Sequence, residues 1–217
     1  MSQWYPVLLN MSSHRCVVMG GGPVAERKVR GLLEAGAQIR LISPTITSQL
    51  QQMVKDGDIE YCAREAVDTD LDDATLVFIA TNQSTVNQDM AVKARSRGVL
   101  VNVAEESTSG DFIVPATLRR GNLVMAVSAS GEGPALASRI IGELAEQYGP
   151  EYEHLIDILG EIRTIVKREV SDANERHNLL RAAVTEDALR EWSEAAHLDD
   201  TEQLLARLRQ RAYEEKG

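Results

Sequence analysis

The sequence predicts an α/β protein with a doubly wound parallel sheet, followed by a small segment of strands and helix and then by a C-terminal helical domain. Three observations support this prediction. Apolar, β-branched runs alternate with amphipathic helical stretches from about residue 15 to residue 102, as in βαβ units. The alternation breaks at Asp111, where two short strands and a turn are expected. After Pro150 the apolar residues keep helical spacing.

The alternating region is expected to contain five strands and three helices. Residues 76–80 are apolar throughout, which is typical of strands covered by helices on both faces. The first helix has its apolar residues on one face, and Gly36 closes it as a C-terminal cap. The expected strands cover residues 16–20, 38–44, 59–63, 75–81 and 99–104, and the expected helices cover residues 24–36, 48–55 and 84–97.

Three consecutive glycines, Gly20, Gly21 and Gly22, separate the first strand from the first helix in a G-x-G-x-x-A pattern that ends at Ala25. Glycine loses more backbone entropy on folding than other residues, so three in a row require a reason. In this pattern the first glycine allows a tight turn, the second lets the backbone approach a pyrophosphate, and the small third residue allows close helix–strand packing. The helix N-terminus also favours phosphate charge. The loop therefore indicates a Rossmann-like dinucleotide-binding domain rather than a structural turn.

The end of the second expected strand leaves NAD and NADP both open. An Asp or Glu is usual about 20 residues after the loop, where it holds the ribose hydroxyls. This chain has Ser43, Pro44 and Thr45 there. A serine hydroxyl can bond a ribose hydroxyl, and its neutrality also tolerates a 2′-phosphate. The residues predicted to bind the cofactor are Gly20, Gly21, Gly22, Pro23, Val24, Ser43, Pro44, Thr45, Thr81 and Asn82.

The second half of the chain is expected to form two further parts. A short strand from Asp111, a turn at 119–122, a strand at 122–128 and a helix at 134–148 precede the helical region. The predicted domains are 1–112 for the dinucleotide, 113–149 for dimerisation and 150–217 for a helical domain. A lone hairpin is marginally stable, which favours pairing of the middle segment with a second copy.

Composition and charge restrict the function. The 217 residues are 43% hydrophobic and 26% charged, which is typical of globular proteins, and the net charge is −10. An acidic balance argues against nucleic-acid and anionic-membrane partners, and the apolar runs are too short to span a bilayer. Cys16, Cys62 and the four histidines have no metal-ligand spacing. The expected protein is cytoplasmic, without a secretory signal or a dedicated metal site.

Several long segments resemble the siroheme-synthase dehydrogenase family, that is, precorrin-2 dehydrogenases with or without sirohydrochlorin ferrochelatase activity. The segments are residues 5–44 with the glycine loop, 78–91 (FIATNQSTVNQDMA), 101–140 (VNVAEESTSGDFIVP and onward) and 174–180 (NERHNLL). The resemblance covers nearly the whole chain, and residues 102–139 are its most specific part. It implies a homodimer with a Rossmann domain, a dimerisation segment and a helical domain, without the methyltransferase domain of larger members.

The resemblance also implies a reaction, NAD-dependent oxidation of precorrin-2 to sirohydrochlorin on the route to siroheme or cobalamin. The family's general base is an aspartate, and Glu105 stands at its position here, with Asp111 as the alternative carboxylate. The substrate carries many carboxylates, which suit guanidinium partners. The residues predicted to bind the substrate are Arg119, Arg120, Ser128, Ser130 and Arg139, although each could instead be an ordinary surface residue.

Two other functions stay open on the sequence alone. A non-catalytic module that senses NAD(H) would need the Rossmann part but no base, and the change of the family's aspartate to Glu105 is what a decayed enzyme would show. A chelatase that has lost dehydrogenation is the other alternative. Some family members insert ferrous iron as well as oxidising the substrate, and Glu105 could serve both activities.

Overall fold

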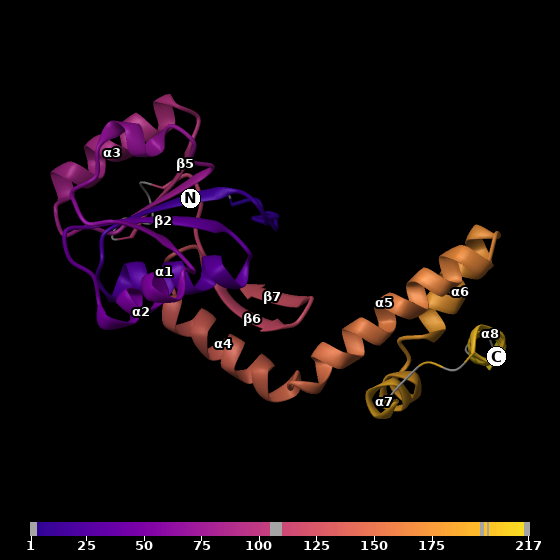
Figure 1. Ribbon diagram of the computed structural model, residues 1–217. Coiled ribbons are helices and arrows are strands. Elements are labelled where there is room, and N and C mark those ends of the chain that lie inside the picture. The colour runs from indigo at the N-terminus through magenta and orange to yellow at the C-terminus, as the bar shows by residue number, and fades with distance from the viewer. Residues whose placement is uncertain (1–3, 105–109, 196–197, 199, 215–217) are drawn as a thin grey trace. The chain divides into compact units, whose positions relative to one another are not determined.

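The computed structural model describes residues 4–104, 110–195, 198 and 200–214. The chain divides into two compact units, Met1–Val114 and Pro115–Gly217, and each is described by itself. The first unit holds the alternating strands and helices, and the second holds a β-hairpin followed by helices (Figure 1). The three-part division predicted from the sequence stays a prediction.

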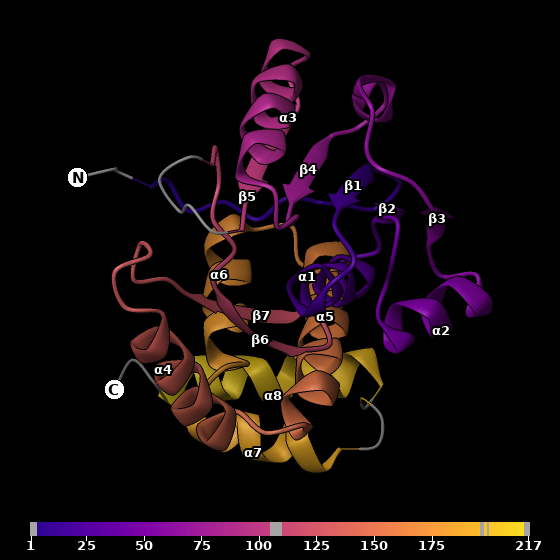
Figure 2. The same ribbon diagram turned by 90° about the vertical axis from the view of Figure 1, so that its left-hand side faces the viewer.

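A parallel sheet in the order β3-β2-β1-β4-β5 forms the centre of the first unit (Figure 2). Its strands are β1 (Arg15–Met19), β2 (Gln38–Ile42), β3 (Glu60–Cys62), β4 (Leu76–Ile79) and β5 (Leu100–Val103). The central strand β1 pairs with β2 through Met19↔Ile42 and with β4 through Met19↔Ile79. The strand order reverses at β1, which confirms the doubly wound fold and creates a crevice at the carboxyl ends of these strands.

Helices cover both faces of this sheet. Helices α1 (Pro23–Glu34) and α2 (Ser48–Asp56) lie on one face, where their apolar residues join the hydrophobic core around Val18 and Leu41. Helix α3 (Ser84–Ser96) and the short 3₁₀ helix η1 (Asp68–Leu71) join the core on the other face. The predicted cap after α1 is confirmed, because Gly36 has a left-handed φ of +72°.

The strand expected to begin at Asp111 begins later, at Ala116. The Asp111 carboxylate accepts hydrogen bonds from Arg95 Nε at 2.9 Å and from the Val101 N–H at 3.0 Å, so it ties this segment to β5 and α3. Pro115 offers no backbone donor for a ladder. Residues 111–115 are therefore a connection to the second unit and not a strand.

The second unit opens with an antiparallel hairpin of β6 (Ala116–Arg120) and β7 (Leu123–Val127). Gly121, with a φ of +53°, lies in the turn, as the sequence indicated. Helix α4 (Pro134–Gln147) follows, and Pro134 begins its first turn. Within this segment of 115–149, only Leu118 and Ala137 are buried apolar residues.

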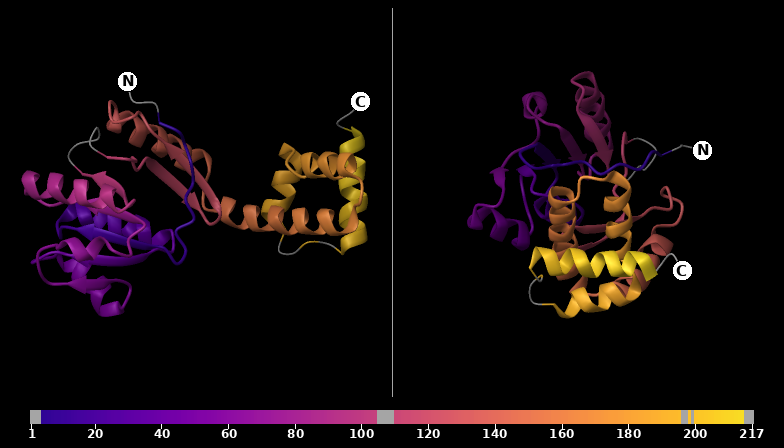
Figure 3. Two further views of the ribbon diagram at one scale, coloured as in Figure 1. Left: turned by 90° about the horizontal axis from the view of Figure 1, so that it is seen from above. Right: turned by 90° about the vertical axis from the view of Figure 1, so that its right-hand side faces the viewer.

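The remaining helices pack around a core of their own (Figure 3). They are α5 (Glu151–Glu169), α6 (Ala173–Ala182), α7 (Glu186–Glu194) and α8 (Thr201–Glu214). Trp192 is 2% exposed, and its indole N–H donates to the Ala183 carbonyl at 2.9 Å, so burial leaves no polar atom of this ring without a partner. None of the described helices is long and apolar enough to cross a membrane.

Candidate functional site

A cleft of about 890 Å³ opens in the first unit beyond the ends of β1, β2 and β4. This edge is where ligands bind in open α/β sheets, and the volume is within the range of small-molecule sites. Pro23 and Val24, which begin α1, do not line the cleft. The other predicted cofactor residues all line it, namely Gly20, Gly21, Gly22, Ser43, Pro44, Thr45, Thr81 and Asn82.

The three glycines are required for different reasons. Gly20 has a φ of +115°, and a Cβ on it would lie 2.3 Å from the Ala80 carbonyl oxygen. A Cβ on Gly21 would lie 1.9 Å from the Thr45 carbonyl oxygen. A Cβ on Gly22 would meet nothing within 4 Å. The packing of the protein therefore explains the first two glycines, whereas Gly22 leaves free space beside the N-terminus of α1, as the approach of a pyrophosphate requires.

The loop after β2 is fastened to this glycine loop. The Thr47 N–H donates to the Gly21 carbonyl at 3.0 Å. The Thr47 hydroxyl donates to Glu26 Oε2 at 2.8 Å and accepts the Leu50 N–H as the N-cap of α2. Thr47 and Glu26 were not among the predicted site residues, although a threonine just before an amphipathic run is a usual sign of an N-cap.

Ser43, at the end of β2, is buried at 7% exposure. Its hydroxyl donates to the Thr45 carbonyl at 2.7 Å, which holds the Pro44–Thr45 turn. The Ser43 carbonyl in turn accepts the Tyr61 hydroxyl at 3.0 Å. The end of β2 therefore offers a ribose no carboxylate, and the hydrogen of the Ser43 hydroxyl is already engaged.

The loop after β4 is held by a buried asparagine that was not predicted from the sequence. Asn87 is 4% exposed and donates through Nδ2 to the Thr81 carbonyl at 3.0 Å. Its Oδ1 contacts the Thr81 hydroxyl, which also accepts the Gln83 N–H at 3.2 Å. Nothing in the sequence distinguishes Asn87 from an exposed helical asparagine, because its role depends on how the loop before α3 folds back onto this helix.

One rim of the cleft is charged. Lys93 Nζ lies 2.9 Å from Asp68 Oδ1 and 2.6 Å from Asp89 Oδ2, so it joins η1 to α3. Hydrogen bonds with Asp89 and Asp68 raise the pKa of Lys93, which is therefore fully charged. All three side chains line the cleft. None of the three was predicted from the sequence, because their juxtaposition depends on how η1 packs on α3.

Glu105, the predicted general base, lies outside the described residues. The alternative, Asp111, is engaged with Arg95 and the Val101 N–H as described above. Among the described residues, no group of three His, Cys, Asp or Glu side chains is arranged to hold a metal ion.

The predicted substrate residues all belong to the second unit. Arg120 Nε donates to the Tyr148 carbonyl at the end of α4 at 3.0 Å. The exposed Arg139 pairs with Glu143, one turn along α4, at 2.8 Å. Ser128 Oγ accepts the N–H of Ser130, whose φ is +54°, so these two serines share one turn. Arg119 is exposed on β6.

A parallel sheet in this order, with a glycine loop at the N-terminus of its first helix and a cleft beside it, defines a dinucleotide-binding protein of the Rossmann class. The family model described as "Putative NAD(P)-binding" matches residues 7–116. The chain belongs to this family.

The relatives of this chain extend the likeness beyond the first unit. The siroheme synthase of Chromobacterium violaceum is 30% identical over 207 residues, which are 94% of this chain and 44% of that protein. The precorrin-2 dehydrogenase of Priestia megaterium is 29% identical over 81% of this chain and 87% of its own length. The solved structure of the precorrin-2 dehydrogenase SirC has a TM-score of 0.75 and 26% identity, and the match covers 95% of this chain and all of that one. The chain thus spans less than half the length of the siroheme synthases it matches.

Proposed function

We propose that this protein oxidises precorrin-2 to sirohydrochlorin with NAD as the cofactor. The observation that carries the proposal is the likeness to the precorrin-2 dehydrogenase SirC along the whole of that chain, in both units. The family of the first unit and the open space at Gly22 support the cofactor.

The residues of the cleft have distinct roles in this proposal. The N–H groups at the start of α1 and the bare backbone at Gly22 would hold the pyrophosphate, and the Pro44–Thr45 turn would lie beside a ribose. When bound, NAD supplies a hydride acceptor. The protein orients the two ligands and provides a carboxylate to take the proton, for which we propose Glu105.

One assay tests the reaction. Purified protein is mixed with precorrin-2 and NAD, and the visible spectrum is followed as the macrocycle gains a conjugated double bond. Sirohydrochlorin formation that depends on NAD supports the proposal, and no spectral change despite measurable NADH binding contradicts it and favours a nucleotide sensor. Ferrous iron added to supplied sirohydrochlorin tests for chelation separately.

The role of Glu105 is tested by Glu105→Gln, with Glu106→Gln as the control that removes the neighbouring carboxylate. A general base contributes about 10²- to 10⁴-fold to a rate, so the first variant is expected to lose turnover by at least 10²-fold and to keep its affinity for NADH. Turnover that is equal in both variants would remove Glu105 from the reaction.

We also propose that residues 115–149 form the interface of a homodimer. The hairpin and α4 bury little apolar surface, and Leu136 on α4 is 57% exposed. Pairing with a second copy would bury such a face. Light scattering after gel filtration is expected to give twice the monomer mass, and Leu136→Glu to give the monomer, whereas Glu132→Gln in the preceding turn should leave the dimer intact. A wild-type monomer contradicts this proposal.

A further inference from the structure

The cleft has no acid at the position from which dinucleotide-binding proteins usually select NAD. In such folds an Asp or Glu after the second strand contacts the ribose 2′-hydroxyl and would repel the 2′-phosphate of NADP. Here that position is held by Ser43, whose hydroxyl already donates to the Thr45 carbonyl. If the protein prefers NAD, the discrimination must come from another part of the cleft.

The charged rim of Asp68, Asp89 and Lys93 lies on the side of the cleft where the adenosine ribose is expected, and it can therefore discriminate between NAD and NADP. Strand β3 pairs with β2, so the segment that leaves β3 enters the cleft next to the end of β2, where the ribose is expected. This segment carries Asp68, and Lys93 connects Asp68 to Asp89 on α3. Glu65, from the same segment, also lines the cleft.

The charge on this side of the cleft is negative. The ionisable groups among the described residues that line the cleft are three carboxylates, Glu65, Asp68 and Asp89, and one ammonium, Lys93, which is bound to two of them. Arg40 on β2 and Arg64, which follows β3, do not line the cleft. Arg40 is paired with Glu60 at 3.1 Å, and Arg64 holds Asp70 through two hydrogen bonds of 2.7 and 2.6 Å.

We infer that Asp68 and Asp89 are specificity-determining residues that select NAD over NADP. Their carboxylates keep the side of the cleft that receives the adenosine ribose negative, and they hold Lys93 in ion pairs. A 2′-phosphate there meets repulsion and finds no unpaired cation among the described residues that line the cleft. The acid missing from the end of β2 is thus replaced by acids from η1 and α3. The inference rests on the proposed dinucleotide cofactor and concerns which residues choose it.

The test measures binding and not turnover, so it is independent of the proposed reaction. NADH and NADPH are titrated against the full-length wild-type protein, Asp68→Asn, Asp89→Asn and the double variant. The ratio of the two dissociation constants is the readout. Each single variant is expected to improve relative NADPH affinity by about threefold and the double variant by about tenfold, because removing each carboxylate removes repulsion and frees Lys93. Asp58→Asn, an exposed acid outside the cleft, is the matched control and should leave the ratio unchanged.

Lys93→Gln is expected to change the ratio of dissociation constants in the opposite direction. This variant therefore distinguishes a role in cofactor selection from a purely structural role. Removing the ammonium leaves both carboxylates unneutralised, so the preference for NADH should increase. A purely structural role would weaken both dinucleotides alike in every variant. Equal wild-type affinities, or an unchanged ratio in the double variant, would overturn this inference and leave the proposed reaction standing. Failure of both dinucleotides to bind the wild type would overturn both proposals.

Discussion

Gly21 and Gly22 are neighbours, but only one of them is required by the fold. A side chain on Gly21 would meet the Thr45 carbonyl, whereas the backbone of Gly22 is extended, with φ −86° and ψ −174°, and has open space beside it. We expect Gly21→Ala to lower the free energy of unfolding by more than about 2 kcal/mol, since a backbone oxygen must move. Gly22→Val should cost about 1 kcal/mol or less and should weaken NADH binding at least tenfold.

Urea unfolding and NADH titration of both variants check this distinction. If Gly22→Val binds NADH as the wild type does, the glycine loop does not receive the pyrophosphate. If Gly21→Ala is as stable as the wild type, the close approach of the two loops is not a constraint of the fold.

Asp70 predicts a pH dependence of stability. It is 4% exposed, and it accepts hydrogen bonds from Arg64 and from the Val67 N–H at 2.8 Å. Burial alone would raise the pKa of Asp70, but the Arg64 and Val67 hydrogen bonds and the charges of Arg64 and Arg40 outweigh it and lower this pKa below its ordinary value of 3.8. Because the folded pKa is depressed, the stabilisation is present above pH 3.8 and is lost as the pH falls through the folded value.

We therefore expect Asp70→Asn to be less stable than the wild type at pH 7 and to lose less stability between pH 5 and pH 2. Urea unfolding at several pH values measures both effects, and Asp58→Asn, at an exposed acid of the same unit, should follow the wild-type curve. Parallel curves for Asp70→Asn and the wild type would show that this carboxylate titrates as it does in the unfolded chain.

At the scale of elements, the periodicity of apolar residues predicted the regular strands and helices of the first unit. It did not predict the elements that depend on tertiary contacts. The order of strands and helices in the first unit follows from the alternation of the sequence, and the cap at Gly36 follows from local glycine chemistry, with a φ of +72°. The 3₁₀ helix η1 was not predicted. The carboxylate of its Asp70 is held by Arg64 and the Val67 N–H, and its Leu71 is buried in the sheet core, contacts that no local pattern reveals.

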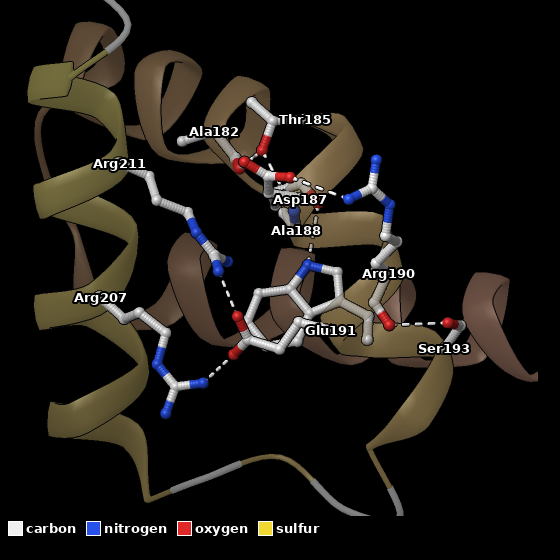
Figure 4. A network of polar contacts seen from close by, with 11 residues as sticks. Ala182, Thr185, Asp187, Ala188, Arg190, Glu191, Ser193, Arg207 and Arg211 are labelled. Carbon is white, nitrogen blue, oxygen red and sulfur yellow. Dashed lines mark hydrogen bonds and ion pairs between the residues drawn. The ribbon is translucent and has the colours of Figure 1, made fainter.

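Helices α7 and α8 are joined by one carboxylate and two guanidinium groups (Figure 4). Arg207 and Arg211, one turn apart on α8, both bond the Glu191 carboxylate, and the Arg211 guanidinium lies 5.3 Å from the centre of the Trp192 ring. Burial would raise the pKa of Glu191, but the hydrogen bonds from Arg211 and Arg207 outweigh it and lower that pKa. The ion pairs of Glu191 with the two arginines thus contribute stability that is lost as the pH falls through this lowered pKa.

We expect Glu191→Gln to lower the free energy of unfolding of the helical part by about 1–3 kcal/mol at pH 7, because charged hydrogen bonds to both arginines are lost. Glu194→Gln, three residues along and exposed, is the control and should change it by less than about 0.5 kcal/mol. Thermal unfolding followed by circular dichroism distinguishes them. Equal melting temperatures for the two variants would mean that the ion pairs make no net contribution to the free energy of unfolding.

At the scale of the whole molecule, the sequence indicated which strand ends line the cleft better than it indicated the charges in that cleft. The glycine loop and the ends of β2 and β4 fall where the cleft lies because strand ends of a parallel sheet share one edge. The rim of Asp68, Asp89 and Lys93 depends on η1 packing on α3, and the engagement of the Ser43 hydroxyl depends on a turn. Neither feature could be predicted without the folded structure. The substrate residues predicted in the second unit stay predictions.

The two units are expected to unfold separately. Each unit has its own buried core, around β1 and β4 in the first and around Ile162 and Trp192 in the second. We therefore expect calorimetry to show two transitions. NADH at about 100 times its dissociation constant stabilises the unit that binds it by about 2.7 kcal/mol, which should raise the transition of the first unit by several degrees and leave the other in place.

Two variants assign the transitions. Gly22→Val should abolish the shift with NADH, because the binding loop lies in the first unit, and Glu191→Gln should lower only the transition that NADH does not move. A single transition that shifts with NADH and also falls in Glu191→Gln would mean that the two units unfold as one cooperative body. In that case dinucleotide bound in the cleft would stabilise the helical part as well, and the stabilities of the two units would be thermodynamically coupled.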